Sequence, residues 1–306
     1  MEGTVYTGIN NIYTVKDKVN GEFYQCRIKG KVLRDDEGEF IRDVYNPLAP
    51  GDTVVFEEDP GHPGQGMISQ RHERRNHFCR LNQKRRSPQF IAANIDLVLC
   101  FTSVKNPPFR PRFLDRVLVA AELGGVKSAI VVNKTDLGME EETLERLDHY
   151  KKLGYDIFLC SAAEGTGLEE LNQFIADSRV AVFGQSGVGK STLLNALEPG
   201  IGLKTSEISD KYDRGRHTTN YSLMIDRASG GQIIDTPGIR QLFLWGVEKE
   251  ELSHYFPEME EFWRDCRFKG CSHRSEPGCR VRDAVEEGVI HHDRYESYLR
   301  LYEDLL

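Results

Sequence analysis

The first 70 residues alternate short hydrophobic runs with turn-forming sequences. The runs lie at residues 4–6, 23–28, 52–56 and 67–68, separated by turn signals such as Asn20-Gly21 and Pro50-Gly51. Runs rich in β-branched and aromatic residues and bounded by Gly, Pro or Asn are typical of β-strands joined by tight turns. The pattern predicts a five-stranded barrel of the OB type over residues 1–70. A small β-sandwich or an SH3-like barrel would give a similar pattern.

From residue 91 onward, apolar runs that predict strands alternate with stretches that predict helices. Strands are predicted at 95–101, 129–132, 157–160, 180–183, 221–225 and 232–234, and helices at 113–123, 140–153 and 168–175. This alternation is typical of a mostly parallel α/β sheet. Beyond residue 247 the pattern becomes helical, at 250–256, 280–287 and 293–305. We therefore expect a barrel (1–70), a linker (71–90), an α/β domain (91–246) and a mostly helical domain (247–306).

The chain has 306 residues and a formal net charge of -8, which by itself disfavours nucleic acid as a partner. The charge is unevenly distributed, because residues 71–86 contain seven basic residues and one acidic residue. We expect this basic linker to contact phosphates, although a solvated linker would have the same composition. No run of about 18 apolar residues predicts a membrane span, and no signal peptide is visible. We expect a cytoplasmic monomer.

A glycine-rich loop follows the predicted strand at 180–183 and matches the pattern GxxxxGK[ST]. In that position the backbone N–H groups and the following helix N-terminus bind nucleotide phosphates. Lys190 is expected to reach the β- and γ-phosphates, and the Ser191 hydroxyl to bind Mg²⁺. The predicted phosphate-binding residues are Gly184, Gln185, Ser186, Gly187, Val188, Gly189, Lys190, Ser191 and Thr192.

The sequence Asn133-Lys134-Thr135-Asp136 follows the predicted strand at 129–132 and indicates which base is bound. A carboxylate accepts hydrogen bonds from the N1–H and exocyclic amine of guanine, and adenine does not offer this pair of donors. Asp136 is therefore expected to select guanine, with Asn133 binding the purine edge and bracing the P-loop. The stem of Lys134 would stack on the base. Ser161 and Ala162 would complete the base pocket through backbone N–H groups.

Two further segments are expected at the γ-phosphate. Asp235-Thr-Pro-Gly238 follows the strand predicted at 232–234, so that Asp235 would lie near Mg²⁺ and the Gly238 N–H near the γ-phosphate. Of Thr218 and Thr219, the second is the better candidate to close on Mg²⁺ and the γ-phosphate. Ordinary GTPases have the P-loop first and NKxD later, whereas here NKTD precedes the P-loop. This order predicts a circular permutation of the domain, which surface termini permit.

The C-terminal part contains a cluster of metal-binding residue types. Cys266, Cys271, His273 and Cys279 offer three thiolates and one imidazole within fourteen residues. This set suits one tetrahedral Zn²⁺ ion with no open position, which is typical of a structural site. Unrelated buried cysteines are the alternative.

Taken together, these motifs resemble the RsgA (YjeQ/YloQ) family of circularly permuted GTPases. The resemblance covers nearly the whole chain and includes Gly215-Arg-His-Thr-Thr219 and the Cys/His cluster. It implies an OB fold, a permuted GTPase domain and a zinc domain. It also implies a role in late maturation of the small ribosomal subunit, with GTP hydrolysis stimulated by that subunit.

The group that activates the attacking water is not the usual glutamine, because Ile239 follows the Asp235–Gly238 motif. His217, beside the switch threonines, is the best candidate for this role, and the resemblance also points to it. A surface histidine in a loop is the alternative. Lys190 and Thr219 complete the predicted catalytic set.

Three functions are compatible with these motifs. The first is a GTPase that binds the small subunit and its rRNA through the barrel and the zinc domain. The second is a GTP-dependent switch that acts on a protein partner. The third, a P-loop ATPase or small-molecule kinase, is disfavoured by Asp136.

Overall fold

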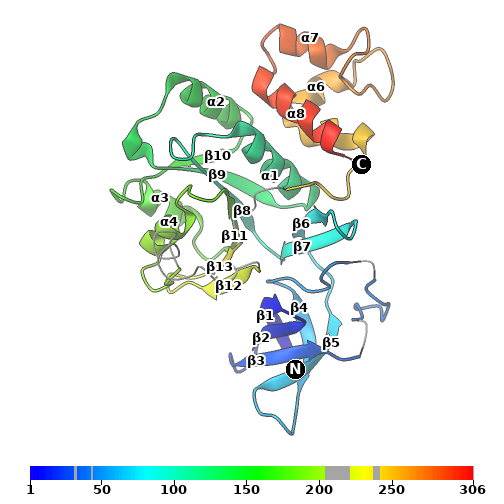
Figure 1. Cartoon of the computed structure of the whole chain (residues 1–306), viewed down its shortest axis with the longest axis vertical. Helices are drawn as coiled ribbons and strands as arrows, with labels where there is room; N and C mark the ends of the chain where they lie inside the picture. The colour runs from blue at the N-terminus through cyan, green and yellow to red at the C-terminus, as the bar shows by residue number, and fades with distance from the viewer. Residues whose placement is uncertain (31–32, 43, 204–220, 237–241, 306) are drawn as a thin grey trace.

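The computed structural model describes residues 1–306 except 31–32, 43, 204–220, 237–241 and 306. Figure 1 shows three parts: a barrel in blue, a central α/β domain in green and yellow, and a helical C-terminal part in orange and red. Of the described helices, none combines the length and apolarity needed to cross a bilayer.

The N-terminal part is a closed five-stranded barrel, as predicted. Its strands are β1 (Glu2–Ile9), β2 (Ile12–Asp17), β3 (Phe23–Ile28), β4 (Thr53–Glu58) and β5 (Gln65–Arg71). They pair in the order β1-β2-β3-β5-β4, and β4 returns to β1 to close the barrel. The β3–β5 pair is parallel, and the other pairs are antiparallel. Alternate side chains such as Val15, Cys26 and Phe56 are fully buried and fill the barrel.

The central domain has a six-stranded sheet with helices on both faces. Its strands are β8 (Leu97–Ser103), β9 (Lys127–Asn133), β10 (Asp156–Leu159), β11 (Arg179–Gly184), β12 (Leu223–Asp226) and β13 (Gln232–Asp235). Its helices are α1 (Pro111–Leu123), α2 (Glu141–Lys152), α3 (Leu168–Phe174) and α4 (Lys190–Leu197). Every residue of β8 is buried because both faces are covered. Val98 and Cys100 face the core with α1 and α2, while Leu99 and Phe101 face the core with α3 and α4.

The strand order of this sheet is β10-β9-β8-β11-β13-β12, parallel except for β12. The strand before the P-loop, β11, therefore lies at the centre although three strands of the sheet precede it in the sequence. The halves β8–β10 and β11–β13 are exchanged in the sequence relative to a GTPase that begins at its P-loop. The strand order of the sheet is therefore that of the predicted permutation.

Residues 71–90 were predicted as a linker, but the structure has an antiparallel hairpin there, formed by β6 (His77–Asn82) and β7 (Ser87–Ala93). Phe78 is fully buried and stacks on Phe183 with ring centroids 3.9 Å apart. The Leu81 N–H donates to the Phe243 carbonyl at 2.9 Å. The hairpin is therefore part of the central domain. Its many basic residues are typical of an exposed linker, so the sequence pattern did not indicate its buried positions.

The basic residues of this stretch are not one continuous phosphate-contacting strip. Arg74, with a side chain 6% exposed, donates two hydrogen bonds of 2.7 Å to Asp52, which is completely buried. Arg75 pairs with Asp96 at 2.6 Å. In contrast, Lys84, Arg85 and Arg86 are exposed at the hairpin turn. Arg74 and Arg75 are therefore paired with carboxylates of the chain, although Arg75 itself is exposed, and the turn presents its charges to solvent.

The barrel joins the central sheet edge to edge. β1 pairs antiparallel with β12 at Thr7 and Leu223, so the two sheets are continuous. The Asp226 carboxylate accepts hydrogen bonds of 2.6 Å from the Tyr6 hydroxyl and from Lys16 Nζ. The edge strand β12 is therefore covered by a partner within the same chain.

The C-terminal part is mostly helical, as predicted. It contains the 3-10 segments η2 (Lys249–Tyr255) and η3 (Pro257–Met259) and the helices α6 (Glu260–Trp263), α7 (Arg280–Glu286) and α8 (His292–Asp304). Figure 1 shows α8 beside α1. The buried residues Phe256, Val281 and Tyr298 belong to the same hydrophobic core as α1 and α2. The helical part therefore packs directly on the central domain.

Candidate nucleotide site and metal centre

The predicted nucleotide-binding residues meet at one edge of the central sheet. The strand register places Ser103 beside Asn133 and Gly184 beside Phe101, while Asp235 lies beside Val182. Loops that follow the carboxyl ends of parallel strands converge at such an edge, which is the usual ligand position in this architecture.

The P-loop runs from Gly184 at the end of β11 to Lys190 at the start of α4. Gly187 and Gly189 have φ angles of +84° and +90°, which side-chain-bearing residues rarely adopt. A Cβ atom on Gly189 would lie 2.3 Å from the Asn133 amide nitrogen, so only glycine fits there. Val188 is buried and anchors the loop, whereas Ser186 and Thr192 are exposed and Gln185 and Ser191 are half-buried.

Lys190 lies against the loop from which it projects. Its Nζ donates to the carbonyls of Gly184 at 2.8 Å and Gln185 at 3.3 Å. Burial lowers the pKa of Lys190, and the carboxylate of Asp235 opposes that shift. Burial raises the pKa of Asp235, and Lys190 counteracts it. Desolvation disfavours both the Lys190 ammonium and the Asp235 carboxylate. An anionic phosphate near Lys190 would stabilise the ammonium, and a cation near Asp235 would stabilise the carboxylate.

Asn133 connects three loops of the site. Its side-chain amide donates to the Val188 carbonyl at 3.0 Å, and its Oδ1 accepts from the Ala162 N–H at 3.2 Å. Lys134 has a left-handed φ of +64° and donates from Nζ to the Gly187 carbonyl at 2.7 Å and to the Asn106 carbonyl. The NKTD segment thus fixes the P-loop from the side.

Asp136 is exposed at the same edge, and its carboxylate is oriented by a buried neighbour. The Ser161 hydroxyl donates to Asp136 Oδ1 at 2.6 Å. The expected donors to a base, the backbone N–H groups of Ser161 and Ala162, are already bound to the Thr166 carbonyl and to Asn133 Oδ1. In this structure the Ser161 hydroxyl therefore orients Asp136 and the Ala162 N–H contacts Asn133, while the expected role of both N–H groups toward a base stays a prediction. Sequence alone did not reveal this, because it depends on side-chain direction.

Several predicted residues lie outside the described part of the chain. They are His217, Thr218, Thr219, Gly238 and Ile239. Their expected roles at the γ-phosphate stay predictions.

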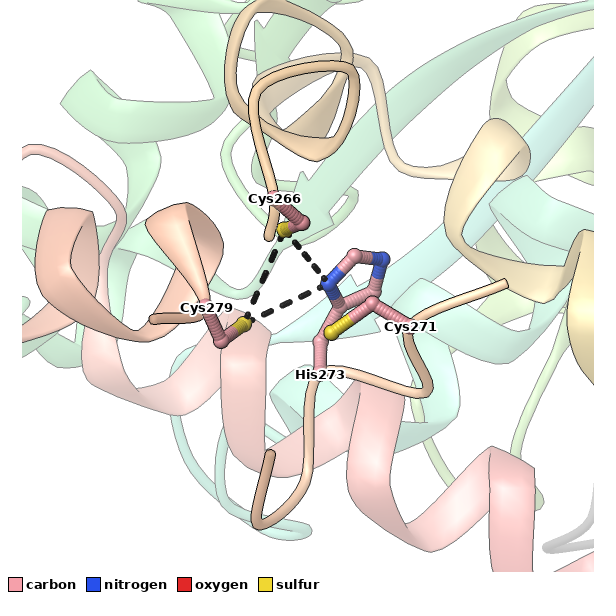
Figure 2. Close-up of side chains that lie close together, drawn as sticks. All are labelled: Cys266, Cys271, His273 and Cys279. Atoms are coloured by element: carbon pink, nitrogen blue, oxygen red, sulfur yellow. Dashed lines mark hydrogen bonds between the residues drawn. The ribbon is translucent and has the colours of Figure 1, made fainter. Parts of the chain in front are cut away.

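The structure brings the four predicted metal ligands together (Figure 2). Cys266, Cys271, His273 and Cys279 have their ligand atoms within 4.8 Å of one another. His273 Nδ1 lies 3.6 Å from Cys266 Sγ and 3.4 Å from Cys279 Sγ, and these two sulfur atoms are 3.9 Å apart. The three thiols and the imidazole point toward a common centre.

These distances fit one tetrahedral metal ion. Bond lengths of about 2.3 Å to sulfur and about 2.0 Å to nitrogen put two sulfur ligands about 3.8 Å apart, and sulfur and nitrogen about 3.5 Å apart. A disulfide would need its sulfur atoms at about 2.05 Å. Burial raises the pKa of Cys271 to about 12 in the metal-free state, and a bound cation would reverse this by stabilising the thiolate.

Residues outside the ligand set hold this loop. Glu276 accepts hydrogen bonds from the Ser272 N–H at 2.8 Å, the Ser272 hydroxyl at 2.6 Å, and the N–H groups of Arg274 and Ser275 at 3.1 Å. Burial opposes its charged form, but these bonds lower the pKa of Glu276 to about 2. The hydroxyls of Tyr295 and Tyr298 on α8 donate to the carbonyls of His273 and Ser272 at 2.6 and 2.8 Å. Sequence analysis did not identify these three residues, because nothing in their spacing marks them.

Comparisons with known sequences agree with this arrangement. A family model described as RsgA GTPase matches residues 71–245, and one described as RsgA N-terminal domain matches residues 2–68. A Flavobacterium psychrophilum protein named small ribosomal subunit biogenesis GTPase RsgA is 40% identical, over 99% of this chain and 93% of that protein. A protein of the same name from Chlorobaculum parvum is also 40% identical, over 98% and 97% of the two chains.

Solved structures of similar proteins have the same architecture. The crystal structure of YjeQ from Thermotoga maritima is 32% identical with a TM-score of 0.74, and the match covers 99% of this chain and 98% of that one. The structure of YloQ, described as a circularly permuted GTPase, is 30% identical with a TM-score of 0.69, covering 99% and 94% of the two chains.

Proposed function

The chain belongs to the RsgA GTPase family, and from this premise we propose that it hydrolyses Mg-GTP and acts in biogenesis of the small ribosomal subunit. The observation that carries the proposal is the convergence of the P-loop, NKTD and Asp235 at one sheet edge, where Asn133 and Lys134 both hold the P-loop. The relatives at about 40% identity bear the name of a small ribosomal subunit biogenesis GTPase.

The described residues suggest how the nucleotide is held. Backbone N–H groups of Gly184–Ser191 and the α4 N-terminus would bind the phosphates, with Lys190 leaving the Gly184 and Gln185 carbonyls to do so. Asp136 would bind guanine, oriented by Ser161, while the stem of Lys134 would lie against the base. The Ser191 hydroxyl and Asp235 would hold Mg²⁺, which supplies charge neutralisation at the phosphates.

For hydrolysis we propose His217 as the group that orients or deprotonates water, with Thr219 and Gly238 closing on the γ-phosphate. The support is the sequence alone: Ile239 has no group to orient water, and an imidazole beside the switch threonines does. Lys190 would neutralise charge that develops on the phosphate oxygens during transfer.

We propose Zn²⁺ as the metal of the Cys/His centre. Three sulfurs and one nitrogen at tetrahedral spacing suit zinc, and the four protein ligands leave no open position for catalysis. The metal would fold the loop from residue 266 to 279, and a ribosome-directed role in the reducing bacterial cytoplasm is compatible with free thiols at these positions.

We propose rRNA as the main contact on the small subunit. The barrel is of a type that binds RNA on its strands and loops, and Phe23 is 50% exposed on β3. The hairpin turn adds Lys84, Arg85 and Arg86 as exposed phosphate contacts. This replaces the continuous basic linker expected from sequence.

GTP hydrolysis measured alone, with purified small subunits and with large subunits tests the proposed function. We expect stimulation by small subunits only, and subunit binding that weakens with added salt because phosphate contacts are lost. Equal rates under all three conditions would refute the proposal. Stimulation that persists at high salt, together with no binding to naked rRNA, would favour a protein partner.

A further inference from the structure

A cavity of about 490 Å³ lies where the barrel meets the central domain, and the proposed function does not use it. Four segments line it: the β1–β2 turn, the loop 45–50 of the barrel, the β6–β7 hairpin and the residues just before β12. Its volume is within the range of about 300–1,000 Å³ that is typical of small-molecule sites. The cavity therefore has the size of a ligand site, and its walls come from both parts of the chain.

The cavity adjoins the nucleotide-binding edge of the sheet but is separate from the P-loop. Tyr221 and Ser222 of its wall directly precede β12, where Leu223 pairs with Asp235 of β13. β13 lies between β12 and β11, the strand that leads into the P-loop. Two strand spacings of about 4.8 Å therefore separate β12 from β11. The described residues that line the cavity include none from the P-loop or the NKTD segment, so a ligand there would not compete with GTP.

The wall of the cavity is positively charged, although the whole chain is acidic. The described residues that line it include Arg80 and Arg85 but no aspartate or glutamate. Arg80 is half-buried, and its Nε donates to Gln89 Oε1 at 3.1 Å. Burial lowers the pKa of Arg80, because the guanidinium is partly removed from water. An anionic ligand in the cavity would stabilise this charge through hydrogen bonds to the guanidinium.

Aromatic rings and side-chain amides make up much of the remaining wall. Tyr45 and Tyr221 are 42% and 37% exposed and come from different segments of the chain. The Arg85 guanidinium lies 5.2 Å from the centroid of the Tyr45 ring. Asn10 and Asn11, both with left-handed φ angles, form the exposed β1–β2 turn and add amide donors and acceptors. The wall thus combines aromatic surfaces, cations and groups that hydrogen-bond to a polar ring edge.

We propose that this cavity binds a free nucleoside monophosphate, with the phosphate at Arg80 and Arg85 and the base against Tyr45 and Tyr221. The proposal goes beyond the proposed function, because it assigns a second nucleotide site that does not use the P-loop. A phosphate group matches the fork of an arginine, and a base has both an aromatic face and a polar edge. An inorganic anion would leave the tyrosines unused, and an uncharged aromatic ligand would leave the arginines unused. Walls from four segments favour a small ligand over a polymer.

The test measures binding of AMP, GMP, CMP and UMP to the full chain by isothermal titration calorimetry. The protein is loaded with zinc, Mg²⁺ and saturating GDP, so that the P-loop site is occupied and further binding reports a second site. We expect at least one monophosphate to bind at least about tenfold more tightly than its nucleoside and than inorganic phosphate. The nucleoside lacks the contacts with the arginines, and inorganic phosphate lacks those with the tyrosines.

Substitutions in the wall separate the two kinds of contact. Arg80→Gln should weaken monophosphate binding about 10- to 100-fold because a charge-assisted hydrogen bond is lost, and Arg80→Lys should recover part of it. Tyr221→Ala should weaken binding about 5- to 100-fold, whereas Tyr221→Phe should retain it, because the ring suffices for stacking. Arg300→Gln is the matched control for charge, since Arg300 is exposed on α8, away from the barrel (Figure 1). GDP affinity should equal that of wild type in every variant, which shows that the fold is retained.

The proposal is overturned if none of the monophosphates binds at about 1 mM, or if Arg80→Gln and Tyr221→Ala bind them as wild type does. Inorganic phosphate that binds as tightly as the monophosphates would overturn it in favour of a simple anion site. A short RNA oligonucleotide that binds more tightly than every monophosphate would overturn it in favour of an RNA segment. These outcomes are separate from the proposed function, which fails only if wild-type hydrolysis is not stimulated by small subunits.

Discussion

Arg294 on α8 is the charge that fixes the C-terminal part to the central domain, and its removal is the most informative perturbation. Its guanidinium, 2% exposed, donates to Asp115 on α1 at 2.5 Å and to both Glu258 oxygens at 2.5 and 3.0 Å. The Tyr150 hydroxyl on α2 also donates to Asp115 Oδ1 at 2.5 Å. Four separate elements therefore meet at one buried cluster.

Arg294→Met keeps the apolar stem but leaves two buried carboxyl groups without their cation. Loss of one partner from a buried ion pair destabilises a protein by about 3–5 kcal/mol, because the remaining charge stays desolvated. The triple variant Arg294→Met, Asp115→Asn, Glu258→Gln carries no unpaired charge and should recover most of that loss. The comparison separates the charge effect from the lost packing of the arginine stem.

The defect should depend on pH. Burial raises the pKa of Asp115, while Arg294 lowers it, so removal of Arg294 raises that pKa further. A folded-state pKa above the unfolded value lends stability at low pH that is lost as pH rises through the folded pKa. Relative to wild type, the free energy of unfolding of Arg294→Met should therefore be lowered least near about pH 5 and most near about pH 8.

Urea unfolding followed by tryptophan fluorescence measures this effect locally, because both tryptophans, Trp245 and Trp263, lie in or beside the C-terminal part. Zinc release provides a second probe of the same part. Arg112→Met is the control, since Arg112 is 54% exposed in its pair with Glu296 and should contribute at most about 1 kcal/mol. The reasoning is refuted if Arg294→Met unfolds like wild type, or if the triple variant is no more stable than the single one.

Three further predictions concern the two sites. Asp136→Asn should weaken GDP binding at least about 100-fold and favour xanthosine diphosphate, because an amide does not accept both guanine donors; unchanged GDP competition would contradict this. His217→Ala should abolish subunit-stimulated hydrolysis without changing GTP affinity, and retained stimulated turnover would exclude the proposed role. Glu276→Gln should lower zinc affinity about tenfold in chelator competition at neutral pH. Because the pKa of Glu276 is lowered to about 2, its carboxylate contributes fully to zinc binding above the ordinary carboxyl pKa of 4.5, and this contribution is lost as the pH falls toward 2. Equal zinc affinity of Glu276→Gln and wild type at neutral pH would argue against this role.

The sequence by itself determined the parts of this protein whose chemistry is local. The P-loop, NKTD and the Cys/His spacing specify phosphate, guanine and metal binding through residues that are close in the chain. The strand and helix periodicity gave the barrel, the α/β sheet and the helical end, and the motif order predicted the permutation. One barrel strand, β2, was not among the predicted runs, although its buried Tyr13 and Val15 alternate with half-buried residues.

Only the tertiary structure decided which charges are buried and what they bind. Arg74 and Arg294 look like surface residues in the sequence, yet they lie in buried ion pairs with Asp52 and with Asp115 and Glu258. The sequence predicted a linker where the β6–β7 hairpin lies. Its Phe78 is buried against Phe183, which is more than 100 residues away in the sequence, so the local pattern did not reveal this contact. The periodicity of hydrophobic residues predicts that one face of a helix or strand is buried. Which segment covers that face depends on packing between segments that are far apart in the sequence. A sequence therefore identifies the site, whereas the fold decides what positions it and which charges stay free for a partner.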